Sequence, residues 1–137
     1  MLEDKKDGFT MNIYRAEKNF NNLKFKIFFK TNEFIEDYSL QTGGRIESYN
    51  KEKILFSVGF LGKFESAQDE NSLLGKIISI NKTNKEYEIM SLGHRNPQGL
   101  FFLKDKNLIV NTEHGPKGGD EINLNFLSMK GKKNYGW

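Results

Sequence analysis

The stretch Ile54-Leu55-Phe56-Ser57-Val58-Gly59 recurs in pattern as Leu108-Ile109-Val110-Asn111-Thr112. Each copy follows a shorter apolar segment and a polar turn. The shorter segments are Gly44-Arg45-Ile46 in the first copy and Gly99-Leu100-Phe101 in the second. The offset is 55 residues between the two leading glycines and 54 between Ile54 and Leu108. The chain therefore contains an internal repeat of a two-strand unit.

A third apolar segment follows each unit, at residues 75–80 and 120–125. Repeats of roughly 40–50 residues, each built from several antiparallel strands, are typical of β-propeller blades. The alternative from the repeat alone is a single β-sandwich whose hairpins happen to look alike. We expect an all-β chain in either case.

The composition is that of an ordinary soluble globular protein, with 36% hydrophobic and 28% charged residues. Twelve Phe and five Tyr favour strands over helices. The net charge of +3 comes from scattered lysines, so no basic stripe predicts nucleic-acid binding. The absence of cysteine excludes disulfides and thiolate metal sites. No apolar run predicts a membrane span, and the charged residues 1–7 do not form a signal peptide.

The remaining periodicity also indicates strands. Leu23, Phe25, Ile27 and Phe29 alternate with lysines, which predicts a half-buried strand. Further strands are expected at residues 11–15, 54–58, 76–80, 87–90, 100–103, 108–111 and 122–126. The only helical candidates are short, at residues 34–38 and 66–74.

At this repeat length the 137 residues hold about two and a half blades. A propeller closes by packing each blade on two neighbours around a ring. We therefore expect residues 1–137 to form one partial propeller domain that is a fragment of a longer one. Its open faces would associate with the remaining blades or with a second chain.

One candidate site cluster is Gly93-His94-Arg95-Asn96-Pro97-Gln98-Gly99, between two predicted strands. The Arg95 guanidinium presents a planar fork of donors that suits a carboxylate, and Asn96 adds a donor and an acceptor. The alternative is a turn in which Arg95 pairs with a nearby acid.

A second cluster is Thr112-Glu113-His114-Gly115-Pro116-Lys117-Gly118-Gly119-Asp120-Glu121-Ile122-Asn123. Its backbone carbonyls and adjacent carboxylates are the oxygen ligands that Ca²⁺ uses. The only histidines, His94 and His114, stand twenty apart without a cysteine, so a zinc site is not expected. The alternative is a β-bulge loop with a solvated acidic pair.

Together with Leu74-Gly75-Lys76-Ile77 and the final Asn134-Tyr135-Gly136-Trp137, these clusters resemble the soluble glucose and aldose sugar dehydrogenases that use pyrroloquinoline quinone (PQQ), the glucose/sorbosone dehydrogenase family. The resemblance covers residues 40–137 and matches the order and spacing of four motifs. It implies a six-bladed β-propeller of four-stranded antiparallel sheets, of which this chain would hold two to three blades. It also implies a quinoprotein oxidoreductase acting on the anomeric or alcohol carbon of a sugar, with PQQ and Ca²⁺ as cofactors.

The resemblance assigns roles to particular residues. Arg95, Asn96, His114 and Asp120 match cofactor-binding positions. The carbonyls of Gly115 and Pro116 match those that bind the Ca²⁺ that activates the quinone. Glu121 and Tyr135 match a second, structural Ca²⁺ site. The family functions outside the cytoplasm, so a periplasmic or secreted location is expected for the full-length protein.

One position departs from the family pattern. The family's catalytic histidine precedes a Gly-Arg pair by three residues, and Gln41 stands there in Gln41-Thr42-Gly43-Gly44-Arg45. A glutamine amide can bond a sugar hydroxyl but cannot take its proton near neutral pH. The alternatives to a dehydrogenase segment are therefore a non-catalytic, Ca²⁺-containing propeller that binds sugars, or a truncated remnant.

Overall fold

The computed structural model describes residues 2–5, 8–17, 22–36 and 39–137. The regular secondary structure of the described residues is almost all β-strand, with one short α-helix and one 3₁₀ turn, which confirms the all-β prediction. The chain divides into two compact units, Met1–Tyr38 and Ser39–Trp137. No helix within the described residues is long and apolar enough to cross a membrane.

The first unit is a three-stranded antiparallel sheet in the order β1 (Leu2–Lys5), β2 (Gly8–Ala16) and β3 (Phe25–Lys30). The Thr31 hydroxyl donates to the Met11 carbonyl at 2.7 Å and ties the end of β3 to β2. Of the alternating apolar residues predicted to form a half-buried strand here, only Phe29 is buried. Leu23, Phe25 and Ile27 are exposed, because an apolar row is buried only where a second layer packs on it.

The helical candidate at residues 34–38 is not a helix where it is described, since Ile35 forms an isolated bridge with Phe9. Residues 37 and 38 of that candidate lie outside the described residues. The second candidate, residues 66–74, is wrong for most of its length. The short helix α1 (Phe64–Gln68) begins two residues earlier than expected and ends at Gln68, so residues 69–74 are not helical.

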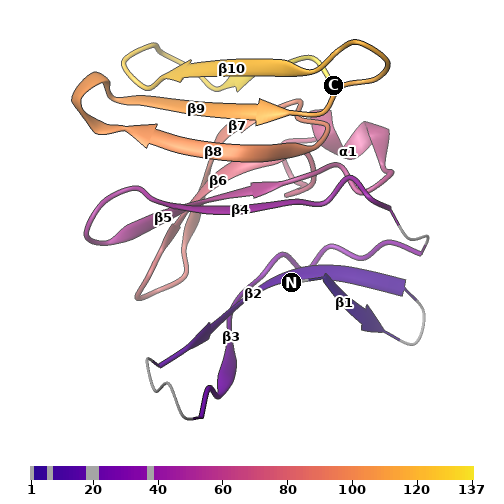
Figure 1. The fold of residues 1–137 in the computed structure, drawn as a ribbon, viewed down its shortest axis with the longest axis vertical. Helices are drawn as coiled ribbons and strands as arrows, with labels where there is room; N and C mark the ends of the chain where they lie inside the picture. Colours follow the sequence, from indigo (N-terminus) through magenta and orange to yellow (C-terminus); the bar gives the residue numbers. More distant parts are fainter. Residues whose placement is uncertain (1, 6–7, 18–21, 37–38) are drawn as a thin grey trace. The chain divides into compact units, whose positions relative to one another are not determined.

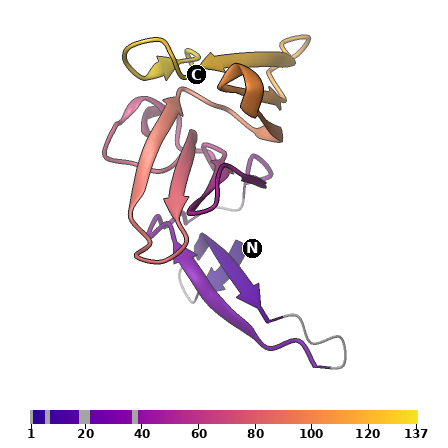
Figure 2. The ribbon, with the colours of Figure 1, turned by 90° about the vertical axis from the view of Figure 1, so that its left-hand side faces the viewer.

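The second unit contains two sheets (Figures 1 and 2). The first has the order β11-β7-β6-β5-β4 and the second the order β10-β9-β8. The strands of the first sheet are β4 (Gly43–Ser48), β5 (Lys53–Val58), β6 (Lys76–Asn81), β7 (Tyr87–Leu92) and the short parallel β11 (Lys133–Asn134). Those of the second are β8 (Pro97–Leu103), β9 (Leu108–Glu113) and β10 (Glu121–Phe126), with a short 3₁₀ turn, Lys104–Lys106, between β8 and β9.

The sequence repeat corresponds to equivalent strand pairs, β4–β5 and β8–β9. Both pairs contain a register shift near the start of their first strand, at Gly43/Ile46 and at Pro97/Gly99. Gly43 and Gly44 have φ of +65° and +100°, so this bulge requires glycine. The repeat therefore encodes a backbone geometry as well as a hydrophobic pattern.

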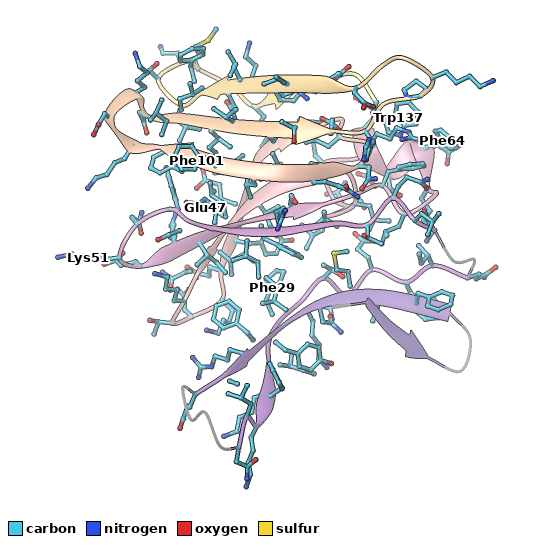
Figure 3. The ribbon with its side chains drawn as sticks, in the orientation of Figure 1. Phe29, Glu47, Lys51, Phe64, Phe101 and Trp137 are labelled. Carbon is cyan, nitrogen blue, oxygen red and sulfur yellow. The ribbon has the colours of Figure 1, made fainter. Side chains whose placement is uncertain are left out.

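The two sheets of this unit meet in an apolar core. Leu55, Ile77 and Ile109 are fully buried there, and Leu100 and Phe102 pack against them. The opposite face of the second sheet carries exposed apolar side chains, including Phe101 on β8 and Ile122 and Leu124 on β10 (Figure 3 labels Phe101). The second sheet thus has one covered and one uncovered apolar face.

Candidate functional site

The two sequence clusters lie at the same end of the second sheet. Pro97, at the start of β8, pairs with Glu113, at the end of β9. The loop before β8 and the loop after β9 therefore meet, because antiparallel neighbours begin and end at a common edge. Two segments nearly twenty residues apart in the sequence thus form one site.

A buried carboxylate joins these loops. Glu113 Oε2 accepts hydrogen bonds from the backbone N–H groups of Arg95 at 2.7 Å and Asn96 at 3.4 Å. Glu113 Oε1 lies 2.8 Å from His94 Nδ1 and accepts from Asn123 Nδ2 at 2.6 Å. Glu113 and His94 are both buried, and His94 Nε2 lies 2.8 Å from the Ser91 hydroxyl.

Burial on its own raises the pKa of Glu113, since desolvation disfavours the charge. The hydrogen bond and charge of His94 and the two backbone donors act in the opposite direction, and the net pKa lies below its usual value. The carboxylate is therefore ionised at neutral pH. Because it can then only accept hydrogen bonds, His94 Nδ1 and Asn123 Nδ2 are the donors.

Arg95 spans from one loop to the other. Its Nη1 donates to the carbonyls of His114 at 2.9 Å and Gly115 at 3.1 Å. Its guanidinium carbon lies 5.2 Å from the ring centroid of Trp137, within the range of a cation–π contact. Trp137 in turn packs on Phe60 and Phe64, at centroid distances of 5.5 Å each. Figure 3 labels Trp137 and Phe64.

Asn96 connects the site to the segment that carries Gln41. Its Oδ1 accepts from the Gly43 N–H at 3.1 Å, and its own carbonyl accepts from the His114 N–H at 3.2 Å. Gln41 Oε1 accepts from the Ser39 hydroxyl at 2.7 Å, and the Gln41 carbonyl accepts from the Leu61 N–H. The side-chain oxygen of Asn96, a residue expected to bind the cofactor, therefore accepts from the backbone.

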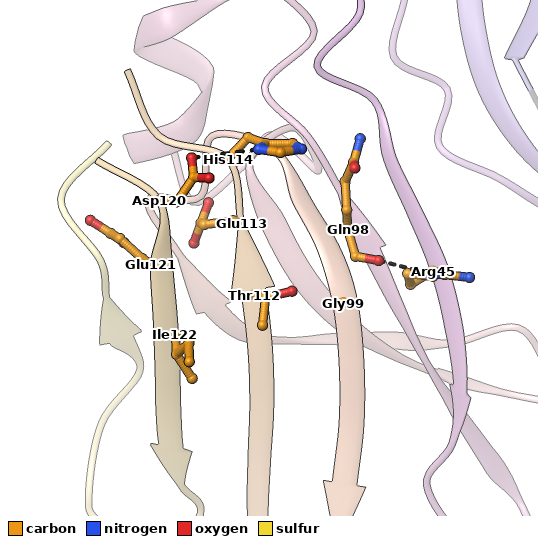
Figure 4. A pocket seen from close by; sticks show the side chains of 9 residues that line it. All are labelled: Arg45, Gln98, Gly99, Thr112, Glu113, His114, Asp120, Glu121 and Ile122. Atoms are coloured by element: carbon orange, nitrogen blue, oxygen red, sulfur yellow. Dashed lines mark hydrogen bonds and ion pairs between the residues drawn. The ribbon is translucent and has the colours of Figure 1, made fainter. Parts of the chain in front are cut away.

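The acidic loop borders an open pocket of about 430 Å³ (Figure 4). His114 Nδ1 lies 3.5 Å from Asp120 Oδ1, which also accepts from the Gly115 N–H at 3.1 Å. On the other side, Arg45 Nε donates to the Gln98 carbonyl at 2.6 Å. The pocket is lined by Arg45, Gln98, Gly99, Thr112, Glu113, His114, Asp120, Glu121 and Ile122.

A smaller pocket, of about 230 Å³, gathers most of the predicted site residues. Its lining includes Arg95, His114, Gly115, Pro116, Glu121 and Tyr135, together with Glu113 and Trp137. Gln41, Asn96 and Asp120 are outside this lining. The structure thus places the predicted residues in the linings of two neighbouring pockets, except for Gln41 and Asn96. The Gly43–Asn96 hydrogen bond joins the segment of Gln41 to the loop that carries Asn96.

Three side chains of the smaller pocket bury polar atoms that have no hydrogen-bond partner within the described residues. They are Arg95 Nε, the Tyr135 hydroxyl and Trp137 Nε1. Burial, with a smaller contribution from the Glu113 charge, raises the pKa of Tyr135 to about 12, so its hydroxyl stays protonated. All three can donate to a ligand. Buried donors without acceptors are costly, so the pocket suits a ligand rich in acceptor oxygens.

The carbonyls of Gly115 and Pro116 already accept hydrogen bonds. Gly115 O accepts from Arg95 Nη1, and Pro116 O accepts from the Gly119 N–H at 2.7 Å. A carbonyl oxygen has two lone pairs, so each can also coordinate a cation. Within the described part of the chain, no three His, Cys, Asp or Glu side chains gather to hold a metal ion.

Sequence reasoning did not assign roles to Glu113, His94, Asn123 or Trp137. The alternation of β9 contained the signal for Glu113. Ile109, Asn111 and Glu113 share one face of the strand, and Ile109 lies in the core, so Glu113 points inward. The contacts of Trp137 join distant segments and leave no local pattern.

Comparison with known proteins places this arrangement in a family. Residues 2–137 match the model of the glucose/sorbosone dehydrogenase family. The chain is 36% identical over 108 residues to aldose sugar dehydrogenase YliI of Escherichia coli, which covers 69% of this chain and 28% of that protein. It is 39% identical over 83 residues to quinoprotein glucose dehydrogenase B of Acinetobacter calcoaceticus, covering 53% of this chain and 16% of that protein.

A solved glucose dehydrogenase superposes on 99% of this chain with a TM-score of 0.82 and 25% identity, and the chain covers 43% of that structure. The chain therefore spans less than half the length of these relatives. The prediction of a partial β-propeller is confirmed, and whether residues 1–137 form one domain of a longer propeller stays a prediction. The chain belongs to the glucose/sorbosone dehydrogenase family.

Proposed function

We propose that this chain is part of an oxidoreductase that oxidises a sugar with PQQ as its cofactor and Ca²⁺ as the activating ion. The observation that carries the proposal is that Arg95, Tyr135 and Trp137 line one pocket and each buries a polar atom with no partner in the described part of the chain. PQQ is a flat anion with several carboxylates. The choice of PQQ is also supported by a relative that is named a quinoprotein.

The residues present fit such a ligand. Arg95 offers a guanidinium fork with a buried donor that has no partner within the described residues. Trp137 and Tyr135 line the same pocket and each also carries such a donor. The Trp137 ring, packed on Phe60 and Phe64, is a rigid apolar surface beside them. These residues would bind and orient the cofactor.

Oxygen donors suited to Ca²⁺ lie alongside, at the carbonyls of Gly115 and Pro116, with Asp120 in the same loop. Arg95 Nη1 would leave the Gly115 carbonyl for a carboxylate of the ligand, since a cation and a guanidinium repel each other at that oxygen. Glu121 and Tyr135 would serve a second, structural Ca²⁺ site. When bound, PQQ would supply a hydride acceptor for the sugar, and Ca²⁺ would supply a Lewis acid beside it.

Gln41 favours a second candidate function, binding of a sugar without oxidation. An amide can hold a sugar hydroxyl but cannot act as a general base near neutral pH. The loss of a positioned base removes about 10²–10⁴-fold in rate. On this reading the propeller retains the family's pockets and has lost the proton acceptor.

The first test is a titration of the purified chain with PQQ, with and without Ca²⁺, followed by quinone absorbance. The proposal expects saturable, Ca²⁺-dependent binding that Arg95→Ala abolishes. Arg45→Ala is the matched control, since Arg45 lines the other pocket and bonds the Gln98 carbonyl. Absence of saturable binding by a folded chain, or equal losses in both variants, contradicts the proposed cofactor site.

Gln41→His separates the two functions. In sugar-dependent dye reduction with PQQ and Ca²⁺, the dehydrogenase proposal expects turnover to rise about 10²-fold or more in the variant. The binding-only alternative expects sugar binding by both proteins and no turnover by either.

A further inference from the structure

We infer that Glu113 is the positioning residue of this site, holding the Arg95–Asn96 backbone in the one arrangement that links three loops. What the inference says of cofactor affinity rests on the proposed function. What it says of the loop geometry does not.

The contacts of Glu113 separate into two sets. Oε2 accepts from two backbone N–H groups, those of Arg95 and Asn96, which can only donate. Oε1 accepts from Asn123 Nδ2 and, more weakly, from Asn111 Nδ2 at 3.4 Å, and lies against His94 Nδ1. One carboxylate thus binds the loop before β8 to the strands β9 and β10.

The residues that Glu113 fixes in turn hold the other segments. The Arg95 carbonyl accepts from the Phe60 N–H at 3.0 Å, and its side chain reaches the His114 and Gly115 carbonyls. Asn96 Oδ1 holds the Gly43 N–H, two residues from Gln41. The direction of the Arg95 side chain, the Gly115 carbonyl and the Gln41 segment therefore depend on the same buried carboxylate.

The polarity of this network makes the inference testable. The Arg95 and Asn96 N–H groups can only donate, so they require an acceptor at the position of Oε2. The hydrogen bond between residues 113 and 123, in contrast, can be formed with donor and acceptor exchanged. In Glu113→Gln, the oxygen of the introduced amide can still face Arg95 and Asn96. Its NH₂ group then meets the NH₂ group of Asn123 in the orientation that the Asn123 amide holds while it donates to Glu121 Oε2. If Asn123→Asp is added, the introduced amide donates to the introduced carboxylate and the network is complete again, with its net charge unchanged.

The neighbouring groups permit this reversal. Ser91 has a hydroxyl that can donate or accept, so His94 can change tautomer and accept from the amide introduced by Glu113→Gln. Glu121, which accepts from Asn123 Nδ2 at 3.2 Å, has an exposed side chain that can turn to solvent. Asn123→Asp alone places two carboxylates against each other and should be the most disruptive of the three variants.

The experiment compares Glu113→Gln, Asn123→Asp and the double variant in three measurements. These are the backbone amide resonance of Arg95, the thermal midpoint and the dissociation constant for PQQ with Ca²⁺. Each single variant should shift the Arg95 resonance and weaken PQQ binding by ~10-fold or more, as for a lost hydrogen bond to a charged group. The double variant should recover the midpoint and bind PQQ within about threefold of the wild type.

Asn125→Ala is the matched control. Asn125 is the next inward-facing Asn of β10 and donates to the Met90 carbonyl at 3.0 Å, away from Glu113. It should lower the thermal midpoint and leave the Arg95 resonance and PQQ affinity unchanged.

Additive losses in the double variant, or an equal loss of affinity in Asn125→Ala, overturn the inference, since Glu113 would then contribute only general stability. If the wild type does not bind PQQ, the proposed function fails. The recovery of the Arg95 resonance and of the midpoint in the double variant still supports or overturns the positioning role.

Discussion

Within Ser39–Trp137, the two repeated strand units have the same backbone arrangement but differ at the end of their central strands, β5 and β9. The first places Gly59 and Gly75 side by side, joined by the Gly75 N–H and the Gly59 carbonyl at 3.0 Å. The second places Glu113 opposite Glu121 at the equivalent positions. The equivalent positions are therefore occupied by glycines, which have no side chain, in the first unit and by glutamates in the second.

The surroundings explain the difference. A Cβ on Gly59 would lie 2.0 Å from the Gln41 carbonyl oxygen, and one on Gly75 would lie 2.6 Å from the Ala67 Cβ. In the second unit the same end of the sheet borders both pockets, which gives the carboxylates space. The repeated fold thus carries ionisable side chains in the copy whose strand ends border a pocket. It carries glycine in the copy whose strand ends are packed against other segments.

The largest loss of stability is expected when a side chain is introduced at the tightly packed strand end of the first unit. Gly75→Ala places a Cβ 2.7 Å from the His94 carbonyl oxygen at a φ of +66°. The left-handed conformation costs a non-glycine residue about 1–2 kcal/mol and overpacking about 1–3 kcal/mol. We expect urea unfolding in metal-free buffer to show a loss of about 2–5 kcal/mol.

The control for this variant is Glu121→Ala, at the equivalent but exposed position, which should change stability by no more than about 0.5 kcal/mol. Equal effects of the two substitutions would show that the ends of the two units are not different in packing.

At the strand end of the second unit, which borders the pockets, Glu113 should make the unfolding free energy depend on pH. The pKa of Glu113 in the folded chain lies below the value of 4.5 for an unperturbed glutamate. Its stabilisation is therefore fully present above about pH 4.5 and is lost as pH falls through the lower folded-state pKa. The loss should approach one charge-assisted hydrogen bond, about 1.5–3 kcal/mol.

Urea unfolding of the wild type and Glu113→Gln between pH 6 and pH 3 measures this effect. The difference in unfolding free energy between the two proteins should narrow toward the acid end. A difference that stays constant over this range would mean that Glu113 does not titrate differently in the folded and unfolded chains.

The sequence was sufficient for the fold because the repeat is local. Strands β4–β5 and β8–β9 each pair through short turns, so their pattern is visible in consecutive residues. The family resemblance assigned the Arg95 and Gly115 loops to one cofactor site, and the structure brings the two loops together at the Pro97–Glu113 pair. The roles of Arg95, His114 and the Gly115 carbonyl toward a cofactor remain predictions.

The sequence could not give what depends on packing between distant segments. Trp137 lies against Phe60 and Arg95, contacts that have no sequence pattern. The alternation at Leu23 to Phe29 predicted a buried face, yet burial requires a partner layer that a strand pattern does not specify. The bond from Gly43 to the Asn96 amide likewise joins residues that only the folded sheet brings near.

The core shared by the two sheets should respond equally on both sides. Ile109 and Leu55 are both fully buried in it, at positions related by the repeat offset. Ile109→Val removes one methylene, with an expected loss of about 0.5–1.5 kcal/mol in urea unfolding. Leu55→Met, a substitution that conserves volume, should cost less than about 1.5 kcal/mol. A loss above 3 kcal/mol for either, a threshold of about twice the upper estimate, would contradict a core shared evenly by the two sheets.

The smallest effect concerns the outer faces of the sheets. Leu124 is 46% exposed, whereas Ile78, at the equivalent ladder position in the first sheet, is fully buried. Leu124→Thr should therefore change the unfolding free energy by no more than about 0.5 kcal/mol. Ile78→Thr buries a hydroxyl without an assured partner, which should cost about 1–3 kcal/mol in addition to the lost apolar contacts. If Leu124→Thr destabilises the chain as strongly as Ile78→Thr, a second layer covers the outer face of β10 in solution, and sedimentation of the two variants would show whether that layer is another copy of the chain.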